Sequence, residues 1–233
     1  MEKLTLYLGS ENIINTPLYK AGNPKNDYGY GFYCTENAEL AKEWACSEEK
    51  DGFANEYSLN LQGLSVLDLS EESYSILNWL AILLKNRTFS PSSDIARDAK
   101  DFLLHNYLIP YEEYDIIKGY RADDSYFTFA NAFLNNTISI EKLNRAMYLG
   151  KLGEQIVLKS SLAFSKIKFI SAACAPRNIY YPKKMNRDNE ARNRFSQLKT
   201  SKEKNTAEEI FIIDIIRGGL KNDDSRIPRI LFK

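Results

Sequence analysis

The chain has 233 residues, 44% of them apolar, so it can bury an ordinary hydrophobic core as one large domain or two small ones. Its 31 basic residues balance 31 acidic residues, which gives no reason to expect tight, sequence-independent binding to nucleic acid. Three widely spaced cysteines without a C-x-x-C pair argue against a disulfide framework or a structural zinc site.

The cysteine pattern fits a reducing cytoplasm. The longest apolar stretch, residues 76–84, is far shorter than the ~20 residues that a membrane-spanning helix needs. The N-terminus also lacks the basic and apolar regions of a targeting peptide. We therefore expect a cytoplasmic protein with no membrane partner.

The first third of the chain predicts short strands around one helix. Residues 3–8 alternate as a half-buried strand, and a loop rich in glycine and proline leads to a short strand within 31–35. Thr35 is expected to cap a helix over 36–46. Alternation on both sides of a glycine within 53–69 predicts two strands or one bent strand.

The middle of the chain predicts mainly helices. Ser70 is expected to cap an amphipathic helix over 71–87. A further helix should run within 92–108 and end before Pro110. Residues 114–120 then resemble a buried strand that enters a polar turn.

Two more helices and two strands follow. The segment 125–136 predicts one helix, and a second helix should start at the cap Ser139 and stop at Gly150. Strands are expected at 153–160 and 168–174, with a short helical segment between them.

The last sixty residues change character. They comprise a charged segment with helical composition, a polar loop, and an amphipathic helix over 207–219 that Gly218 and Gly219 close. Strand and helix do not alternate regularly along the chain, so we expect a mixed α+β fold and disfavour a parallel doubly wound one.

Common catalytic templates are absent from the sequence. The only histidine, His105, lies in an apolar helical stretch, so no Ser-His-Asp or Cys-His site can form without it. There is no Walker A loop and no G-x-G-x-x-G after a strand. Asp123 and Asp124 could hold a divalent ion only in a turn, and a polar turn that binds its own backbone is an equal alternative. We assign no metal ligands.

Three short segments that are far apart in the sequence carry a resemblance: LYLGS at 6–10, DYGYGFYCT at 27–35 and GEQIVLKS at 153–160. Together they resemble the three-part NAD site of mono-ADP-ribosyltransferases, in the His-Tyr-Glu branch that accepts glutamine in third place. The chain is most similar to a bacterial family of ADP-ribosyltransferase-like proteins, long filed as a domain of unknown function and often encoded beside a small partner gene, as toxin–antitoxin pairs are. The order and spacing of other segments, including YDIIKGYRADD and DIIRGGL, extend the resemblance over nearly the whole chain.

The resemblance implies an ADP-ribosyltransferase fold, in which a split, mostly antiparallel β core surrounds an NAD cleft. Residues 1–175 would form this domain with a helical insertion, and 176–233 would form a helical C-terminal extension packed on it. The implied activity is that of a toxin that transfers ADP-ribose from its substrate NAD to a macromolecular acceptor, either protein or nucleic acid. A cognate small antitoxin protein is the implied partner.

The resemblance also implies roles for individual residues. The backbone of Gly9, beside Ser10, would bind the nicotinamide amide, because a side chain there would crowd the ring. The ring of Tyr33 would stack on nicotinamide. Gln155 would contact a hydroxyl of the nicotinamide ribose and help the sugar carry positive charge as nicotinamide leaves. Each could instead be an ordinary strand residue.

The resemblance implies further candidates: Tyr30, Gly31 and Phe32, just before Tyr33, as wall and loop residues, and Arg87, Arg121, Asp123 and Asp124, elsewhere in the chain, as groups that line the NAD site. The two arginines could bind the pyrophosphate through paired hydrogen bonds, or they could be solvated or ion-paired.

The departure from the family pattern is Leu8, which stands where members usually have a histidine that binds the adenosine ribose. Loss of one such hydrogen bond costs about 1–3 kcal/mol if a buried partner stays unpaired. The chain could be a natural member with weak or lost activity, a deliberately inactivated variant, or a member that uses Ser10 or another donor. NAD hydrolysis, or non-catalytic binding of a nucleotide or a protein segment, are the alternative functions.

Overall fold

The computed structural model describes residues 3–122, 124–149, 154–200 and 209–229, and its class is α+β, as the order of elements predicted. The chain divides into two compact units. Unit 1 comprises Met1–Asp68, Tyr111–Gly119 and Leu152–Arg187, and unit 2 comprises Leu69–Pro110, Tyr120–Lys151 and Asp188–Lys233. The boundary expected at residue 175 falls inside unit 1.

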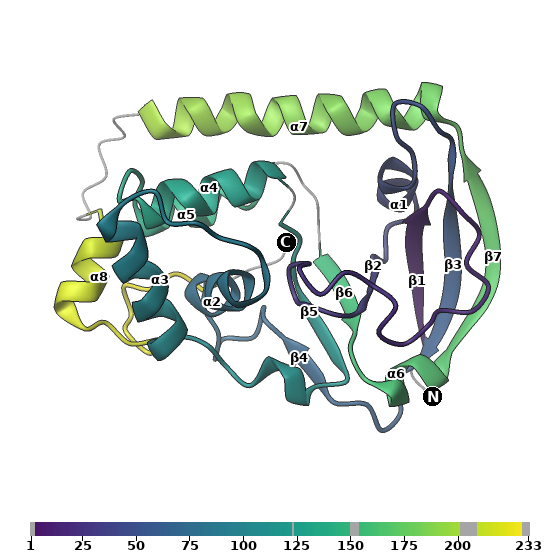
Figure 1. Ribbon diagram of the computed structural model, residues 1–233, viewed down its shortest axis with the longest axis horizontal. Helices are drawn as coiled ribbons and strands as arrows, with labels where there is room; N and C mark the ends of the chain where they lie inside the picture. Colours follow the sequence, from purple (N-terminus) through teal and green to yellow (C-terminus); the bar gives the residue numbers. More distant parts are fainter. Residues whose placement is uncertain (1–2, 123, 150–153, 201–208, 230–233) are drawn as a thin grey trace. The chain divides into compact units, whose positions relative to one another are not determined.

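One sheet of unit 1 is antiparallel, with the order β1-β3-β7 (Figure 1). Its strands are β1 (Lys3–Ser10), β3 (Gly52–Asn60) and β7 (Ile167–Ala175). Helix α1 (Ala38–Ala45) packs against β1 and β3. The predicted strand at the N-terminus is therefore confirmed and is two residues longer than expected.

The second sheet has the order β2-β6-β5-β4. Its strands are β2 (Phe32–Cys34), β6 (Glu154–Leu158), β5 (Ile116–Tyr120) and β4 (Val66–Asp68). The pair β2–β6 is antiparallel, whereas β4 and β5 are parallel. The 3₁₀ turn η1 (Tyr111–Glu113) precedes β5.

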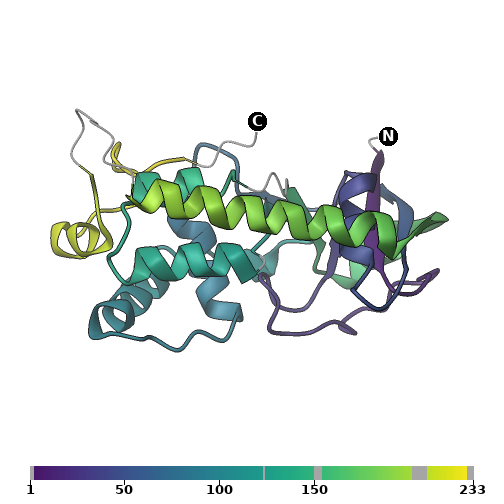
Figure 2. The same ribbon diagram turned by 90° about the horizontal axis from the view of Figure 1, so that it is seen from above.

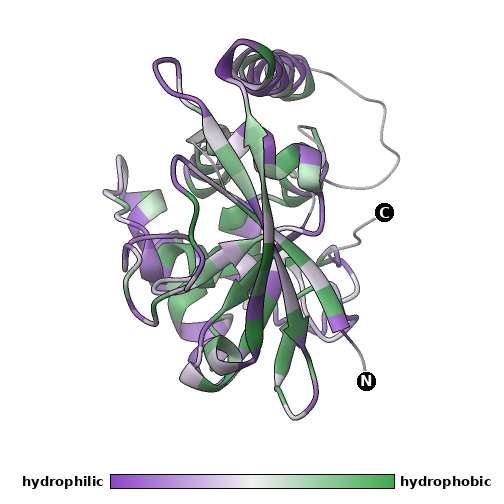
Figure 3. Ribbon diagram, turned by 90° about the vertical axis from the view of Figure 1, so that its right-hand side faces the viewer, coloured by the Kyte–Doolittle hydropathy of each residue, from purple (hydrophilic) through white to green (hydrophobic). Residues whose placement is uncertain are grey.

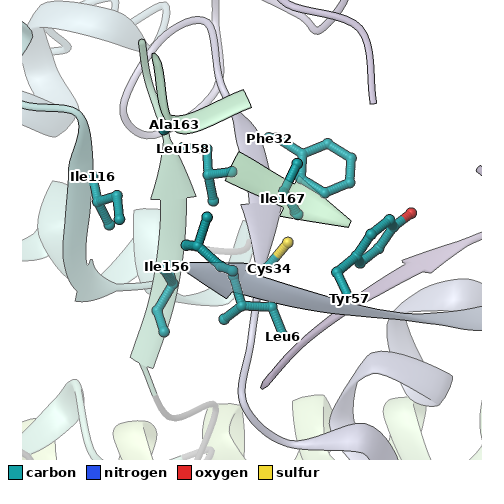
Figure 4. Close-up of a cluster of buried hydrophobic side chains, with 10 residues drawn as sticks. Leu6, Phe32, Cys34, Tyr57, Ile116, Ile156, Leu158, Ala163 and Ile167 are labelled. Carbon is teal, nitrogen blue, oxygen red and sulfur yellow. The ribbon is translucent and has the colours of Figure 1, made fainter. Parts of the chain in front are cut away.

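Apolar side chains from the two sheets form one hydrophobic cluster (Figure 4). Each strand contributes every second residue to the cluster, because side chains alternate between the two sides of a sheet. Helix α6 (Ser161–Lys166) adds Ala163. The fully or nearly buried members are Leu6, Phe32, Cys34, Tyr57, Leu59, Ile116, Ile156, Leu158, Ala163 and Ile167.

Unit 2 is helical and has an aromatic core. Its helices include α2 (Ile76–Asn86), α3 (Asp94–Asn106), α4 (Asp124–Leu134), α5 (Ile140–Ala146) and α8 (Ile212–Gly218). Among its largest fully buried side chains are Trp79, Tyr107, Tyr126, Phe129 and Phe133. The indole of Trp79 donates a hydrogen bond of 3.2 Å to the carbonyl of Tyr120, so this bulky core residue keeps its polar atom paired.

The long helix α7 (Arg177–Thr200) begins in unit 1 and ends in unit 2 (Figure 2). Its ribbon is coloured mostly as hydrophilic, in agreement with the charged composition of this segment (Figure 3). In unit 1, Arg187 forms two hydrogen bonds of 2.8 Å to the buried carboxylate of Glu43. This paired contact holds the helix against α1.

Two predicted helix caps are wrong. The cap of α1 is Asn37, whose side chain accepts a hydrogen bond from the amide of Leu40, because Thr35 is already bound to β1 through its backbone. Helix α2 is capped by Ser75 and not by Ser70. At α2, the side chain of Asn78 accepts a hydrogen bond of 2.8 Å from the amide of Ser75.

The remaining helix ends agree more closely with the sequence. Ser139 caps α5, as predicted, and Gly219 ends α8 in the left-handed region at φ 56°. The expected stop at Gly150 lies outside the described residues. No helix in the described part of the chain has both the length and the apolarity to cross a bilayer.

Candidate functional site

The two sheets of unit 1 meet at a single backbone bridge between β1 and the end of β2. The amide of Tyr7 donates to the carbonyl of Thr35 over 2.7 Å, and the amide of Thr35 donates to the carbonyl of Tyr7 over 3.0 Å. This bridge brings two of the three sequence motifs together, since Leu8, Gly9 and Ser10 follow Tyr7 directly.

Gly9 presents its backbone at the edge of the sheet. Backbone groups along a strand alternate between its two edges, so the amide and carbonyl of Gly9 point to the same edge as those of Tyr7. The carbonyl of Leu8 points the other way and accepts a hydrogen bond from the side chain of Asn55 on β3. Beyond Thr35, no strand in the described part of the chain pairs with this edge of β1. The amide and carbonyl of Gly9 thus have no strand partner at this edge among the described residues.

The structure shows a physical reason for glycine at position 9 that the sequence did not reveal. A Cβ atom there would lie 2.0 Å from the carbonyl oxygen of Ala41 and 2.8 Å from the amide nitrogen of Ala45. Both atoms belong to the backbone of α1, so neither can rotate away. Close packing of this helix on β1 excludes any side chain at this position.

The neighbours of Gly9 differ in polarity. Leu8 is partly buried and packs against the hydrophobic cluster between the sheets. The hydroxyl of Ser10 accepts a hydrogen bond of 3.2 Å from the amide of Asn12, in an exposed turn. Leucine at position 8 therefore has a stable apolar environment and offers no polar atom to a ligand.

Tyr33 is held by its own loop. Its hydroxyl accepts a hydrogen bond of 3.1 Å from the amide of Tyr28 and donates one of 2.6 Å to the carbonyl of Gly29. Gly29 has φ 75°, in the left-handed region that glycine adopts without strain. The hydroxyl thus fixes the shape of the glycine-rich loop, and the half-buried ring lies on the outer face of its sheet.

The other candidates near Tyr33, which are Tyr30, Gly31 and Phe32, differ in how deeply they are buried. The ring of Phe32 is in the hydrophobic cluster, edge-to-face with Tyr57 at a centroid distance of 5.3 Å (Figure 4). Phe32 is thus a core residue and not the exposed wall that we expected. Tyr30 is 44% exposed and remains accessible. Gly31 packs on β6, where a Cβ atom would lie 2.4 Å from Val157.

Gln155 is the most informative side chain of the site. It is only 5% exposed, and its carbonyl oxygen Oε1 has no hydrogen-bond partner among the described residues. An unpaired buried acceptor of this kind costs about 1–3 kcal/mol. Such a cost is tolerated where a ligand supplies the missing donor.

The strand register brings Gln155 toward Gly9. The last pair of β2 and β6 joins Cys34 with Ile156, so the same register continued by one residue sets Thr35 beside Gln155. Thr35 is bonded in turn to Tyr7. Gln155 and the edge of β1 are therefore separated by two strand spacings, about 10 Å. The third motif joins the other two at this place.

A second polar group was not predicted from the sequence. Lys118 on β5 lies 3.3 Å from the carboxylate of Asp68 and 3.6 Å from that of Glu154. Burial raises the pKa of Glu154, while the nearby ammonium of Lys118 opposes this shift. Burial also disfavours the charge on Lys118, but the two carboxylates raise its pKa overall. Glu154 shares a face with Ile156 and so points away from Gln155, because side chains alternate along a strand.

The candidates in unit 2 form a separate group. The guanidinium of Arg87 donates a hydrogen bond of 2.6 Å to the carbonyl of Ala122 and lies 5.1 Å from the ring centroid of Phe127. Arg121 is partly exposed. Asp124 is the first residue of α4, and its side chain lies outside the described part.

Asp123 also lies outside the described residues. Within the residues that are described, no three histidine, cysteine, aspartate or glutamate side chains gather into a group that could hold a metal ion. The three cysteines are free thiols.

Comparison with known proteins gives a family but no function. Residues 4–169 match the model of a family whose description reads "Protein of unknown function (DUF3990)". Neither the search of curated proteins nor that of solved structures returned a match. The matched range contains all the motifs of unit 1 described above and covers more than half of the chain. The chain therefore belongs to the DUF3990 family of proteins of unknown function.

Proposed function

We propose that this protein is a mono-ADP-ribosyltransferase that transfers ADP-ribose from NAD to a macromolecular acceptor. The observation that carries the proposal is the buried, unpaired Oε1 of Gln155, close in register to the unpaired edge of β1. A dinucleotide with a carboxamide and ribose hydroxyls supplies the donors and acceptors that these two places lack.

Gln155 fits the role that the resemblance implies for it. An amide carbonyl can accept a hydrogen bond from a ribose hydroxyl, and this bond strengthens as the sugar gains positive charge. The side chain is already buried and needs no further desolvation.

The remaining parts of the proposed site supply shape. The amide and carbonyl at Gly9 suit the two-bond pairing of a carboxamide. Tyr30 lies in the loop before β2 and Tyr33 lies in β2, and the hydroxyl of Tyr33 fixes this loop by hydrogen bonds, so the two rings can flank an aromatic ligand at little entropic cost.

The proposed reaction balances without a redox partner. The bond between the anomeric carbon and the nicotinamide nitrogen breaks, and nicotinamide leaves with the bonding electron pair. A nucleophile of the acceptor then forms a bond to the anomeric carbon and loses its proton to water or a nearby base. If water is the nucleophile, the outcome is NAD hydrolysis.

Leu8 favours weak activity or a purely binding role for this chain. It packs against the hydrophobic cluster and has no atom that could bind a ribose hydroxyl. We propose that Leu8→His increases NAD affinity by about tenfold or more, as expected for one regained hydrogen bond to a buried partner. A toxin role in the cytoplasm, with a cognate small antitoxin protein as partner, forms part of the same proposal.

The test is incubation of the purified chain with labelled NAD and cell lysate, together with direct measurement of NAD binding by calorimetry. Variants are Leu8→His, Gln155→Ala and, as a matched control, Gln62→Ala at an exposed glutamine. Label should appear with Leu8→His, weaken with Gln155→Ala and stay unchanged with the control. Removal of the label by nuclease or by protease identifies the acceptor.

If Leu8→His neither binds NAD more tightly nor labels any macromolecule, the transferase proposal is wrong. If it binds NAD but releases only free ADP-ribose and nicotinamide, the chain is a hydrolase. If NAD binds and remains intact, the site is a binding module.

A further inference from the structure

Lys159 is a partly buried cation to which no role has yet been assigned. It follows β6 directly, and its backbone amide donates a hydrogen bond of 2.8 Å to the carbonyl of Asp115. This bond anchors the residue to the chain just before β5. The side chain is only partly exposed and points to the glycine-rich loop.

The ammonium of Lys159 binds that loop at two points. It donates to the carbonyl of Tyr30 over 2.6 Å and also to the carbonyl of Tyr28. The residue between them, Gly29, has φ 75° and accepts the hydroxyl of Tyr33. One cation and one phenol therefore hold three consecutive carbonyls.

The surroundings of Lys159 offer little other compensation for its charge. The ring of Tyr111 lies 5.8 Å from the ammonium nitrogen. Glu112 is the carboxylate that acts on it through space. The nearby carboxylate of Asp115 is held by the hydroxyls of Ser65 and Ser160. The two loop carbonyls are thus the direct hydrogen-bond acceptors of the ammonium among the described contacts.

We propose that Lys159 is the positioning residue for the glycine-rich loop, and that its ammonium keeps residues 28–31 ordered. A charged donor forms stronger hydrogen bonds to carbonyls than a neutral group does. Loss of the ammonium therefore loosens the loop that carries Tyr30. This inference concerns the loop itself and does not depend on the ligand that the loop binds.

Burial lowers the pKa of Lys159 to about 8, and the charge of Glu112 opposes this shift. The side chain is therefore mostly protonated at pH 7, where its ammonium can donate to both carbonyls. Loosening of the loop and global unfolding both expose the ammonium, so a rise in pH favours neither of them through Lys159.

The test measures the order of the loop directly, by limited chymotrypsin cleavage at Tyr30 and by amide hydrogen exchange of residues 28–31. The variants are Lys159→Met, Lys159→Arg and the control Lys168→Met, which removes an exposed lysine from β7. At pH 7, Lys159→Met should be cleaved about tenfold faster than the wild type, as expected for one lost charge-assisted hydrogen bond.

Lys159→Arg should keep the loop protected at pH 7, because the guanidinium is also a charged donor. The control should match the wild type. The proposal is overturned if Lys159→Met protects the loop as well as the wild type does. Failure to bind NAD in all variants would count against the proposed function while leaving the cleavage result intact.

Discussion

Replacing Gln155 by methionine should stabilise the ligand-free protein. Methionine has nearly the same length and shape but lacks the carbonyl oxygen that is buried without a partner. An unpaired buried acceptor costs about 1–3 kcal/mol, whereas two apolar groups of equal shape pack at little cost. We therefore expect the free energy of unfolding to rise by about 1–2 kcal/mol.

The same substitution should abolish any stabilisation by NAD, since the acceptor for the ribose hydroxyl is gone. For a protein of this size, 1 kcal/mol shifts the melting temperature by about 2–4 °C. Scanning calorimetry with and without NAD therefore measures both effects in one series. The matched control is Gln62→Met at an exposed glutamine, which should change neither quantity.

A loss of stability of more than about 1 kcal/mol on Gln155→Met would refute this reasoning. Such a loss would mean that the amide of Gln155 already has its hydrogen bonds in the free protein. The carbonyl would then be part of the structural framework, and the strongest support for a ligand at this place would be lost.

Two further outcomes follow from the geometry of unit 1. Gly9→Ala should lower the free energy of unfolding by about 3 kcal/mol, because the new methyl group meets the carbonyl of Ala41, which is fixed in a helix. Urea denaturation measures this change, and a change below about 1 kcal/mol would contradict the close packing. Although burial opposes it, hydrogen bonds from Ser160 and Ser65 lower the pKa of Asp115. The folded protein thus favours the charged form of Asp115. Its contribution to the free energy of unfolding is present above the pKa of the unfolded chain and is lost as the pH falls through the lowered pKa of the folded protein. Asp115→Asn should reduce this acid sensitivity in unfolding curves between pH 6 and pH 3, and an unchanged dependence on pH would exclude the role.

Local patterns predicted the elements of this protein well. Alternation identified β1 and the two strands on either side of the turn after β3, and helical spacing identified α1 to α5. These patterns succeed because each element buries one face, and burial imposes a period of two or of 3.6 residues on the sequence. The exact caps were harder to predict, since several polar residues precede α2 and only packing selects Ser75.

Tertiary structure decided which of the candidate residues meet. The sequence alone determined an α+β chain, the strands that carry Leu8, Tyr33 and Gln155, and a family-like order of motifs. It did not determine that Phe32 would be buried between the sheets or that α1 would exclude a side chain from Gly9. Those facts depend on contacts between residues that are far apart in the chain.

The same holds for the two polar features on which the proposals depend. The carbonyl of Gln155 is buried without a partner among the described residues, and this becomes visible only when its neighbours are in place. Lys159 looks like any lysine after a strand until folding brings the carbonyls of Tyr28 and Tyr30 to its ammonium. Sequence periodicity reports which face of an element is buried, whereas hydrogen-bond satisfaction and charge burial are properties of the assembled fold.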